Sequence, residues 1–179
     1  MKQTGKLADM KTILSLILLL LAGTTPLAFA TTPGEVEVGS MLREAPMQGL
    51  SGPSRLLSDF RGKPLIINVW ASWCGPCQQE MASLERLSRR GGKKFAVIGI
   101  STDDYPDAAK AFLQHYKTSF SHYIDSPPFP LENMLGANRL PLTLLVDAQG
   151  RVLGKYYGAQ EWDSPATVAL IGKSFRINL

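Results

Sequence analysis

Cys74 and Cys77 are the only cysteines in this chain of 179 residues. They follow an apolar run at 64–70 that is typical of a buried strand, and the segment after them carries apolar residues at helical spacing. Cys74 is therefore predicted at the N-terminus of a helix, where unpaired N–H groups and the helix dipole stabilise a thiolate. Cys77 falls on the same helical face, close enough to bond Cys74. This arrangement predicts a reversible disulfide.

Two other uses of a cysteine pair fit the sequence less well. A structural zinc site needs a full set of Cys or His ligands, and the nearest candidates, His115 and His122, are distant in the sequence. A purely structural disulfide here would close a very short loop and would remove little chain entropy from the unfolded state. We therefore predict redox chemistry with no metal and no cofactor.

The residues around the pair resemble the thioredoxin superfamily, and most closely its extracytoplasmic TlpA/ResA-type members. The resemblance covers about residues 38–175 and is carried by the segments 57–64, 67–80, 97–103 and 140–150. It implies an α/β, thioredoxin-like fold: a central mixed β-sheet flanked by helices, with an N-terminal β-hairpin. It also implies a thiol:disulfide oxidoreductase that acts on protein disulfides.

The proposed exchange reaction needs a nucleophile, a resolving thiol and a group that handles protons. Position favours Cys74 as the nucleophile and Cys77 as the more shielded resolving residue. Thioredoxins have a buried aspartate on the preceding strand, but the matching residue here is Asn68, which cannot take a proton. Glu80, one turn after Cys77 and present in TlpA/ResA-like chains, is the replacement candidate. The alternative is a plain solvated helix glutamate.

Five further residues are predicted to contact the substrate. Trp73 is expected on a partly exposed docking surface. The resemblance places a cis-proline at Pro141, facing the cysteines, where an added substrate strand would pair beside Leu140. Leu140 departs from the threonine, valine or isoleucine that is usual at this position. The predicted substrate-binding residues are Trp73, Gly75, Pro76, Leu140 and Pro141.

The N-terminus predicts export. Three lysines precede an apolar run, Ile13–Ala22, and Ala28-Phe29-Ala30 fits a signal peptidase site. The run is short for a membrane span of about 20 residues, but a continuation over 12–29 would make an uncleaved anchor. We expect a signal peptide or N-terminal anchor at 1–30, a tether at 31–37 and a thioredoxin-like domain at 38–179. The protein would then be periplasmic or otherwise extracytoplasmic, secreted or anchored to the inner membrane.

The remaining sequence predicts one domain of alternating strands and helices. The net charge of +4 falls to +2 without residues 1–30, which is too little for nucleic-acid binding. The pattern suits a mixed sheet with helices on both faces. Expected elements are a hairpin within 41–60, strands at 65–70 and 95–101, helices at 75–90 and 103–117, an irregular insert at 118–139 with at most one short helix, a hairpin of 142–146 with 151–157, and a helix at 164–174.

Three functions remain open at this point. The first is an exported reductant of protein disulfides, of the cytochrome c maturation or metal-site assembly type, recharged by a membrane thiol-disulfide electron donor. The second is a disulfide oxidant or isomerase, since the reduction potential decides the direction. The third is a non-catalytic Cu(I) or metal-binding module, because soft thiolates suit Cu(I).

Overall fold

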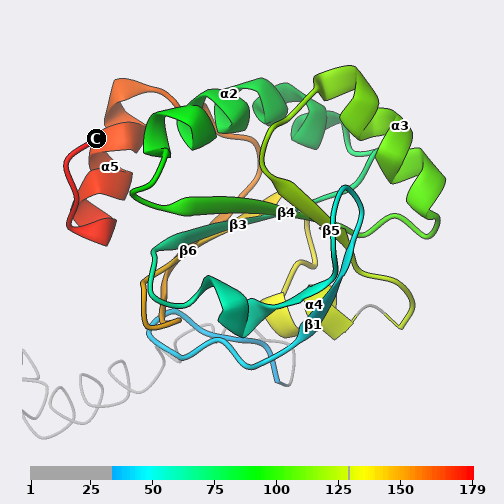
Figure 1. Cartoon of the computed structure of the whole chain (residues 1–179), viewed down its shortest axis with the longest axis horizontal. Helices are drawn as coiled ribbons and strands as arrows, with labels where there is room; N and C mark the ends of the chain where they lie inside the picture. Colours follow the sequence, from blue (N-terminus) through cyan, green and yellow to red (C-terminus); the bar gives the residue numbers. More distant parts are fainter. Residues whose placement is uncertain (1–33, 129) are drawn as a thin grey trace, which may run out of the picture. The chain divides into compact units, whose positions relative to one another are not determined.

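The structure, a computed structural model, describes residues 34–128 and 130–179 (Figure 1). The predicted signal peptide or anchor and the start of the tether lie outside these residues. Within the described ranges, no helix is long and apolar enough to cross a membrane. In chain order the elements are β1 (Pro46–Gly49), β2 (Arg55–Leu56), the 3-10 helix η1 (Leu57–Phe60), β3 (Leu65–Trp70), α2 (Gly75–Gly91), β4 (Ala96–Ser101), α3 (Pro106–Tyr116), β5 (Ser121–Ile124), α4 (Pro130–Leu135), β6 (Leu142–Val146), β7 (Val152–Tyr157) and α5 (Pro165–Phe175).

A seven-stranded mixed sheet organises the described part of the chain, with strand order β2-β1-β5-β4-β3-β6-β7. β3 lies inside the sheet: Leu65 is opposite Ala96 in the parallel strand β4 and opposite Val146 in the antiparallel strand β6. Every residue of β3 is buried, which explains its almost continuous apolar sequence. The predicted mixed sheet is confirmed, and its central strand leads directly to the cysteines.

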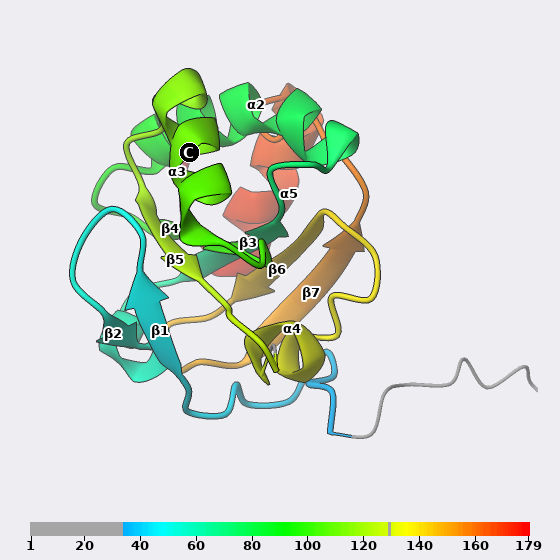
Figure 2. The ribbon, with the colours of Figure 1, turned by 90° about the vertical axis from the view of Figure 1, so that its right-hand side faces the viewer.

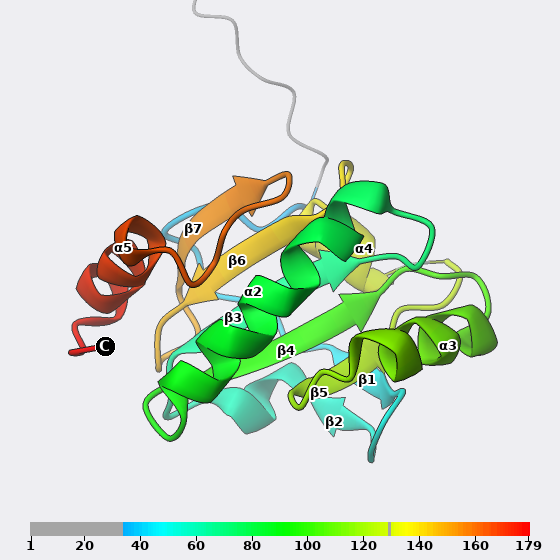
Figure 3. The ribbon, with the colours of Figure 1, turned by 90° about the horizontal axis from the view of Figure 1, so that it is seen from above.

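Helices cover both faces of the sheet, as predicted (Figure 1, Figure 2). α2, α3 and α5 pack on one face, where Met81, Phe112 and Ile171 belong to one buried cluster. η1 and α4 pack on the other face, where Leu57 and Leu131 belong to a second cluster. Figure 3 shows α2 lying across β3 and β4, between α3 and α5. This packing fixes the N-terminus of α2, and with it the cysteines, above the end of β3.

The predicted N-terminal hairpin is confirmed as β1 and β2, which are antiparallel with Pro46 opposite Leu56. β1 also pairs with β5, so the hairpin extends one edge of the sheet. The residues before it are packed as well. Val36 is buried, its N–H donates to the Met134 carbonyl, and Lys155 forms an ion pair with Glu35. The packed fold thus includes residues before the predicted boundary at 38.

The segment 118–139 is more regular than predicted. Besides the short helix α4 it contains the strand β5, which runs parallel to β4 with His122 opposite Gly99. Our prediction of an irregular insert was wrong because this strand has only four residues, too few for an apolar period to be recognised. Pairing with β4 and β1 on its two sides stabilises it instead.

The helix predicted at 103–117 starts later, at Pro106. A proline is favourable in the first turn because its missing N–H would have no partner there. Asp103 lies outside the helix, and its carboxylate accepts hydrogen bonds from Ser72 on a distant segment. The predicted start was wrong because Pro106 favours the first position of the helix, and Asp103, which precedes it, binds Ser72 instead.

Candidate active site

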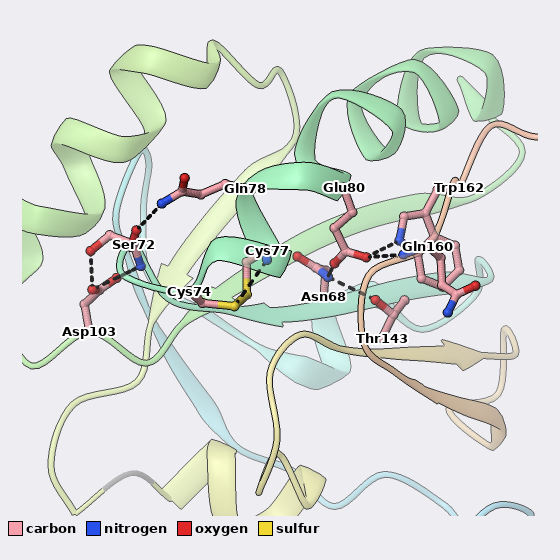
Figure 4. Close-up of a disulfide and its surroundings, with 10 residues drawn as sticks. All are labelled: Asn68, Ser72, Cys74, Cys77, Gln78, Glu80, Asp103, Thr143, Gln160 and Trp162. Atoms are coloured by element: carbon pink, nitrogen blue, oxygen red, sulfur yellow. Dashed lines mark hydrogen bonds between the residues drawn. A yellow bond between two sulfur atoms is a disulfide. The ribbon is translucent and has the colours of Figure 1, made fainter.

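The cysteine pair lies where the chain leaves β3 and enters α2 (Figure 4). Cys74 is the N-cap residue of α2, Cys77 lies in its first turn, and a disulfide joins them with Cα atoms 5.3 Å apart. The Cys74 sulfur accepts a hydrogen bond from the Cys77 N–H at 3.2 Å. In the reduced protein the same donor and the helix dipole would stabilise a Cys74 thiolate. The structure places both cysteines where the sequence analysis expected them.

The two sulfurs differ in their access to a substrate. Cys77 is completely buried, whereas Cys74 borders a groove with a volume of about 530 Å³. Trp73 stands beside Cys74 with 71 % of its surface exposed. Four of the five predicted substrate-binding residues line this groove, namely Trp73, Gly75, Pro76 and Leu140, and its charged groups are Asp104, Glu132 and Arg139.

Pro141 is the fifth predicted substrate-binding residue. The peptide bond between Leu140 and Pro141 is cis, as the resemblance implied. Pro141 is buried, and its carbonyl accepts a hydrogen bond from the Gly158 N–H at 2.8 Å. Leu140 is half-buried and is the member of this pair that lines the groove.

Glu80 points into the protein and is only 1 % exposed (Figure 4). Its Oε1 accepts a hydrogen bond from Asn68 Nδ2 at 2.7 Å. Its Oε2 accepts from the indole Nε1 of Trp162 at 2.8 Å and from the backbone N–H of Gln160 at 3.1 Å. This burial excludes the alternative of a solvated helix glutamate.

Burial also changes the proton affinity of this carboxyl group. Desolvation raises the pKa of Glu80 from its ordinary value of 4.5 to about 7. The hydrogen bonds from Trp162, Asn68 and Gln160 stabilise the carboxylate and oppose the rise, but desolvation is the larger effect. A carboxyl group that titrates near neutral pH can both accept and return a proton there.

Asn68 links Glu80 to the neighbouring strand. Its Nδ2 donates to Thr143 Oγ1 on β6 at 3.0 Å as well as to Glu80. Its Oδ1 is buried and has no hydrogen-bond partner among the described residues. An amide so placed can serve both protonation states: its NH₂ donates to the carboxylate, and after rotation its oxygen accepts from the carboxylic acid.

The sequence analysis missed three residues that the fold brings to this site. Asp103 was assigned to the helix predicted at 103–117, and no part in the chemistry was predicted for Trp162 or Gln160. A buried tryptophan usually finds an acceptor for its N–H, so Trp162 carried a usable signal. Gln160 carried none, because it donates through its backbone.

The two histidines lie on β5 and α3, not on the elements that carry the cysteines. His122 is buried between aromatic rings of Trp70 and Phe120, and desolvation lowers its pKa to about 3, so the ring is neutral. His115 lies in the last turn of α3. Over residues 34–128 and 130–179, no group of His, Cys, Asp and Glu side chains is arranged to hold a metal ion.

Known proteins share both the sequence pattern and the fold. The Redoxin family model matches residues 44–171. The chain is 31% identical over 154 residues to the thiol-disulfide oxidoreductase ResA of Geobacillus thermodenitrificans, covering 85% of this chain and 87% of that protein. It is 30% identical over 156 residues to the thioredoxin-like protein YneN of Bacillus subtilis, covering 83% and 90% respectively.

A solved structure extends the likeness to three dimensions. The Chlorobium tepidum protein assigned as thiol:disulfide interchange protein DsbE has a TM-score of 0.72 at 26% identity, over 78% of this chain and 99% of that one. The chain therefore belongs to the Redoxin family and has a thioredoxin-like fold. With its paired cysteines at the helix terminus, it is a thiol:disulfide oxidoreductase.

Proposed function

We propose that this protein is an exported reductant of protein disulfides, of the type that serves cytochrome c maturation or metal-site assembly. The observation that carries the proposal is a Cys-Gly-Pro-Cys pair at a helix N-terminus with a buried carboxyl group, Glu80, that titrates near neutral pH on the same helix. Gly75-Pro76 is the dipeptide found between the cysteines of reducing thioredoxins.

Two exchange steps would carry the electrons. The Cys74 thiolate attacks one sulfur of the client disulfide, forming a mixed disulfide while the client S–S bond breaks and the released client thiolate takes up a proton. Cys77 then loses its proton and attacks the Cys74 sulfur, which releases the second client sulfur as a thiolate that is protonated in turn. The client gains two electrons and two protons, and the Cys74–Cys77 disulfide forms.

Glu80 would handle the proton of the second step. Cys77 is completely buried, so it has no direct access to solvent that could take its proton. Glu80, as a carboxylate with a pKa of about 7, is matched to accept a proton near neutral pH and to return it when the disulfide is reduced again. This assigns Cys74, Cys77 and Glu80 to attack, resolution and proton transfer.

The compartment determines the partners that this cycle requires. The leader-like sequence at 1–30 supports export, either secreted or held by an anchor at 12–29. Exported compartments are oxidising, so a reductant there must be recharged after every turnover. We infer a membrane protein that supplies a dithiol, which reduces the Cys74–Cys77 disulfide and is itself oxidised.

The reduction potential of the cysteine pair tests the direction of electron flow. We expect a value near that of thioredoxin, about −270 mV, after equilibration with a thiol buffer. A value above about −180 mV would contradict the reductant and support the alternative, a disulfide oxidant or isomerase. A protein that binds Cu(I) but leaves insulin disulfides intact would support the metal-binding module.

Trapping tests the roles of the two cysteines. A Cys77→Ser variant should accumulate a mixed disulfide with a client through Cys74, because the resolving thiol is missing. Mass spectrometry of the complex identifies the linked residue. Accumulation by a Cys74→Ser variant instead would reverse the assignment.

A further inference from the structure

A second buried carboxylate, Asp103, lies close to the cysteines and has no role in the cycle above (Figure 4). It is 2 % exposed and stands just after the end of β4. Its Oδ2 accepts a hydrogen bond from Ser101 Oγ at 2.7 Å, and its Oδ1 accepts from Ser72 Oγ at 2.6 Å. The backbone N–H of Ser72 points at both oxygens, at 3.2 and 3.0 Å.

These bonds hold the short loop that carries the nucleophile. Ser72 lies between the end of β3 and Cys74, whereas Asp103 belongs to the segment that follows β4. The loop is also held from the side of α2, where Gln78 Nε2 donates to the Ser72 carbonyl at 3.1 Å. Inside the loop, the Cys74 N–H donates to the Ala71 carbonyl at 3.2 Å. Asp103 is thus the contact that connects this loop to β4.

The same bonds connect two segments that line the groove. Thr102 and Asp104, on either side of Asp103, both line it, and so do Trp73 and Cys74, which follow Ser72. A change at Asp103 would therefore alter the spacing of the groove as well as the position of the sulfur. A protein client that fills the groove should sense this more than a small disulfide that meets only the sulfur.

We propose that Asp103 is a positioning residue for the exchange reaction, which acts through Ser72 to hold the Cys74 sulfur at the N-terminus of α2 and at the edge of the groove. It touches no reacting atom. The proposal rests on the proposed function for its choice of a protein disulfide as client, but its geometry is independent of the direction of electron flow.

A positioning role and a purely electrostatic role of Asp103 predict opposite shifts of the Cys74 pKa when Asp103 is replaced. A carboxylate near a thiolate raises the thiol pKa, so removing only a charge would lower it. Positioning keeps the sulfur against the Cys77 N–H, which lowers the pKa, so releasing the loop would raise it. The sign of the shift after substitution of Asp103 therefore separates the two explanations.

The experiment compares Asp103→Asn with the wild type in the reduced state. The amide keeps the size of the side chain but loses one acceptor oxygen and the charge. We expect the Cys74 pKa, followed by thiolate absorbance, to rise. We expect kcat/KM for insulin to fall about 10- to 100-fold, as for misplaced reactive groups, and the rate with a small aromatic disulfide to fall by only about 3-fold.

Three further variants keep the test decisive. Ser72→Ala removes the hydroxyl contact but keeps the backbone N–H. The Cys74 pKa should therefore rise and the exchange rates should fall, both by less than in Asp103→Asn. This variant gives a result even if Asp103→Asn does not fold. The exchange rates of the double variant Ser72→Ala/Asp103→Asn should be no lower than those of Asp103→Asn alone. Asp107→Asn, the same chemical change at an exposed residue in the first turn of α3, should leave pKa and rates unchanged.

The outcomes distinguish this proposal from the proposed function. A fall in the Cys74 pKa of Asp103→Asn would show that charge matters and would overturn positioning. If Asp103→Asn kept the wild-type Cys74 pKa and rates but had a lower melting temperature, Asp103 would be a purely structural residue. That result would also overturn the positioning role. If wild-type protein failed to reduce insulin, the proposed function would fail, while the pKa comparison would still decide the role of Asp103.

Discussion

Glu80 and Glu85 lie on the same helix but in different surroundings. Glu80 faces the sheet, where uncharged groups of Asn68 and Trp162 donate to it. Glu85 lies near the surface, where it forms an ion pair with Arg89 at 2.5 Å and accepts a hydrogen bond from the Ser119 N–H at 2.8 Å. The two side chains are chemically identical, so any difference in their behaviour comes from these neighbours.

The neighbours shift the two pKa values in opposite directions. Desolvation dominates at Glu80 and raises its pKa to about 7. At Glu85 partial burial also raises the pKa, but the hydrogen bonds from Ser119 and Arg89 together outweigh it and lower the pKa below the ordinary value. Of the two, only Glu80 can therefore exchange protons near neutral pH, and five predictions on four variants test this contrast.

Asn68→Asp should have the largest effect because it places a second carboxyl group beside Glu80, where Nδ2 now lies 2.7 Å from Oε1. Two buried carboxylates at this spacing cannot both ionise without strong repulsion. We expect the free energy of unfolding to fall by about 3–5 kcal/mol at pH 8. The loss should be much smaller at pH 5, where the pair keeps a proton. Urea denaturation at both pH values measures it, and equal losses would contradict repulsion as the cause.

Glu80→Gln should remove a pH dependence of stability. The folded pKa of about 7 exceeds the ordinary value of 4.5, so folded protein binds more protons between these limits and loses stability as pH rises through them. The loss amounts to about 3 kcal/mol and is complete above the folded pKa. Denaturation across this pH window should show that the free energy of unfolding depends less on pH in the variant than in the wild type. A matched Glu85→Gln variant, from the same helix, should keep the wild-type slope.

The same variant tests the link to the cysteines. An ionised Glu80 disfavours further negative charge nearby, so Glu80→Gln should lower the Cys74 pKa and slow the steps that move a proton at Cys77. Thiolate absorbance against pH and stopped-flow exchange rates measure both. Superimposable titrations with equal rates would leave Glu80 without a part in the chemistry.

Trp162→Phe should have a moderate effect that depends on pH. The indole N–H stabilises the ionised form of Glu80, so its loss should raise the Glu80 pKa further and cost about 1–2 kcal/mol of stability at pH 8. The smaller ring also leaves a cavity, and that cost should be the same at pH 5 and pH 8. The difference between the two pH values isolates the hydrogen bond. No difference would mean that Gln160 and Asn68 alone hold the carboxylate.

Glu85→Gln should have the smallest effect. Its lowered pKa means that the contacts with Ser119 and Arg89 stabilise the protein above the ordinary pKa and lose this effect as pH falls. Because Arg89 is mostly exposed, we expect a loss of about 0.5–1 kcal/mol at pH 7 and low salt, which added salt diminishes. A larger loss that persists in salt would show that the contact with Ser119 matters more than the ion pair.

Local sequence predicted the elements that surround the cysteines well. The strand at 65–70 has the predicted bounds, and the helix predicted at 75–90 ends one residue later. The last helix starts after Ser164, whose side chain accepts a hydrogen bond from the Thr167 N–H. Asp147 lies in the predicted turn, where it accepts from the Gln149 and Arg151 N–H groups. These features could be predicted from the sequence because the residues that form them are only a few positions apart.

Features that depend on distant partners were missed or left open. The strand β5 forms because two other strands flank it, and Asp103, which was predicted in a helix, instead binds Ser72, 31 positions earlier. Spacing placed Glu80 near Cys77 but could not say whether it was buried. Trp162 and Gln160, which hold it, come from the far end of the chain.

The sequence by itself determined the chemistry available to this protein: a cysteine pair at a strand-to-helix junction, with a glutamate one turn further on. These are short-range properties, set by residue type and helical spacing. Only the tertiary structure decided how that chemistry is tuned. Desolvation of Glu80 needs the sheet and the loop at 160–162 packed over α2, and the loop before Cys74 is held by Asp103, a carboxylate from the segment after β4. Burial and charge environment depend on the whole packed neighbourhood, and residue spacing alone does not specify it.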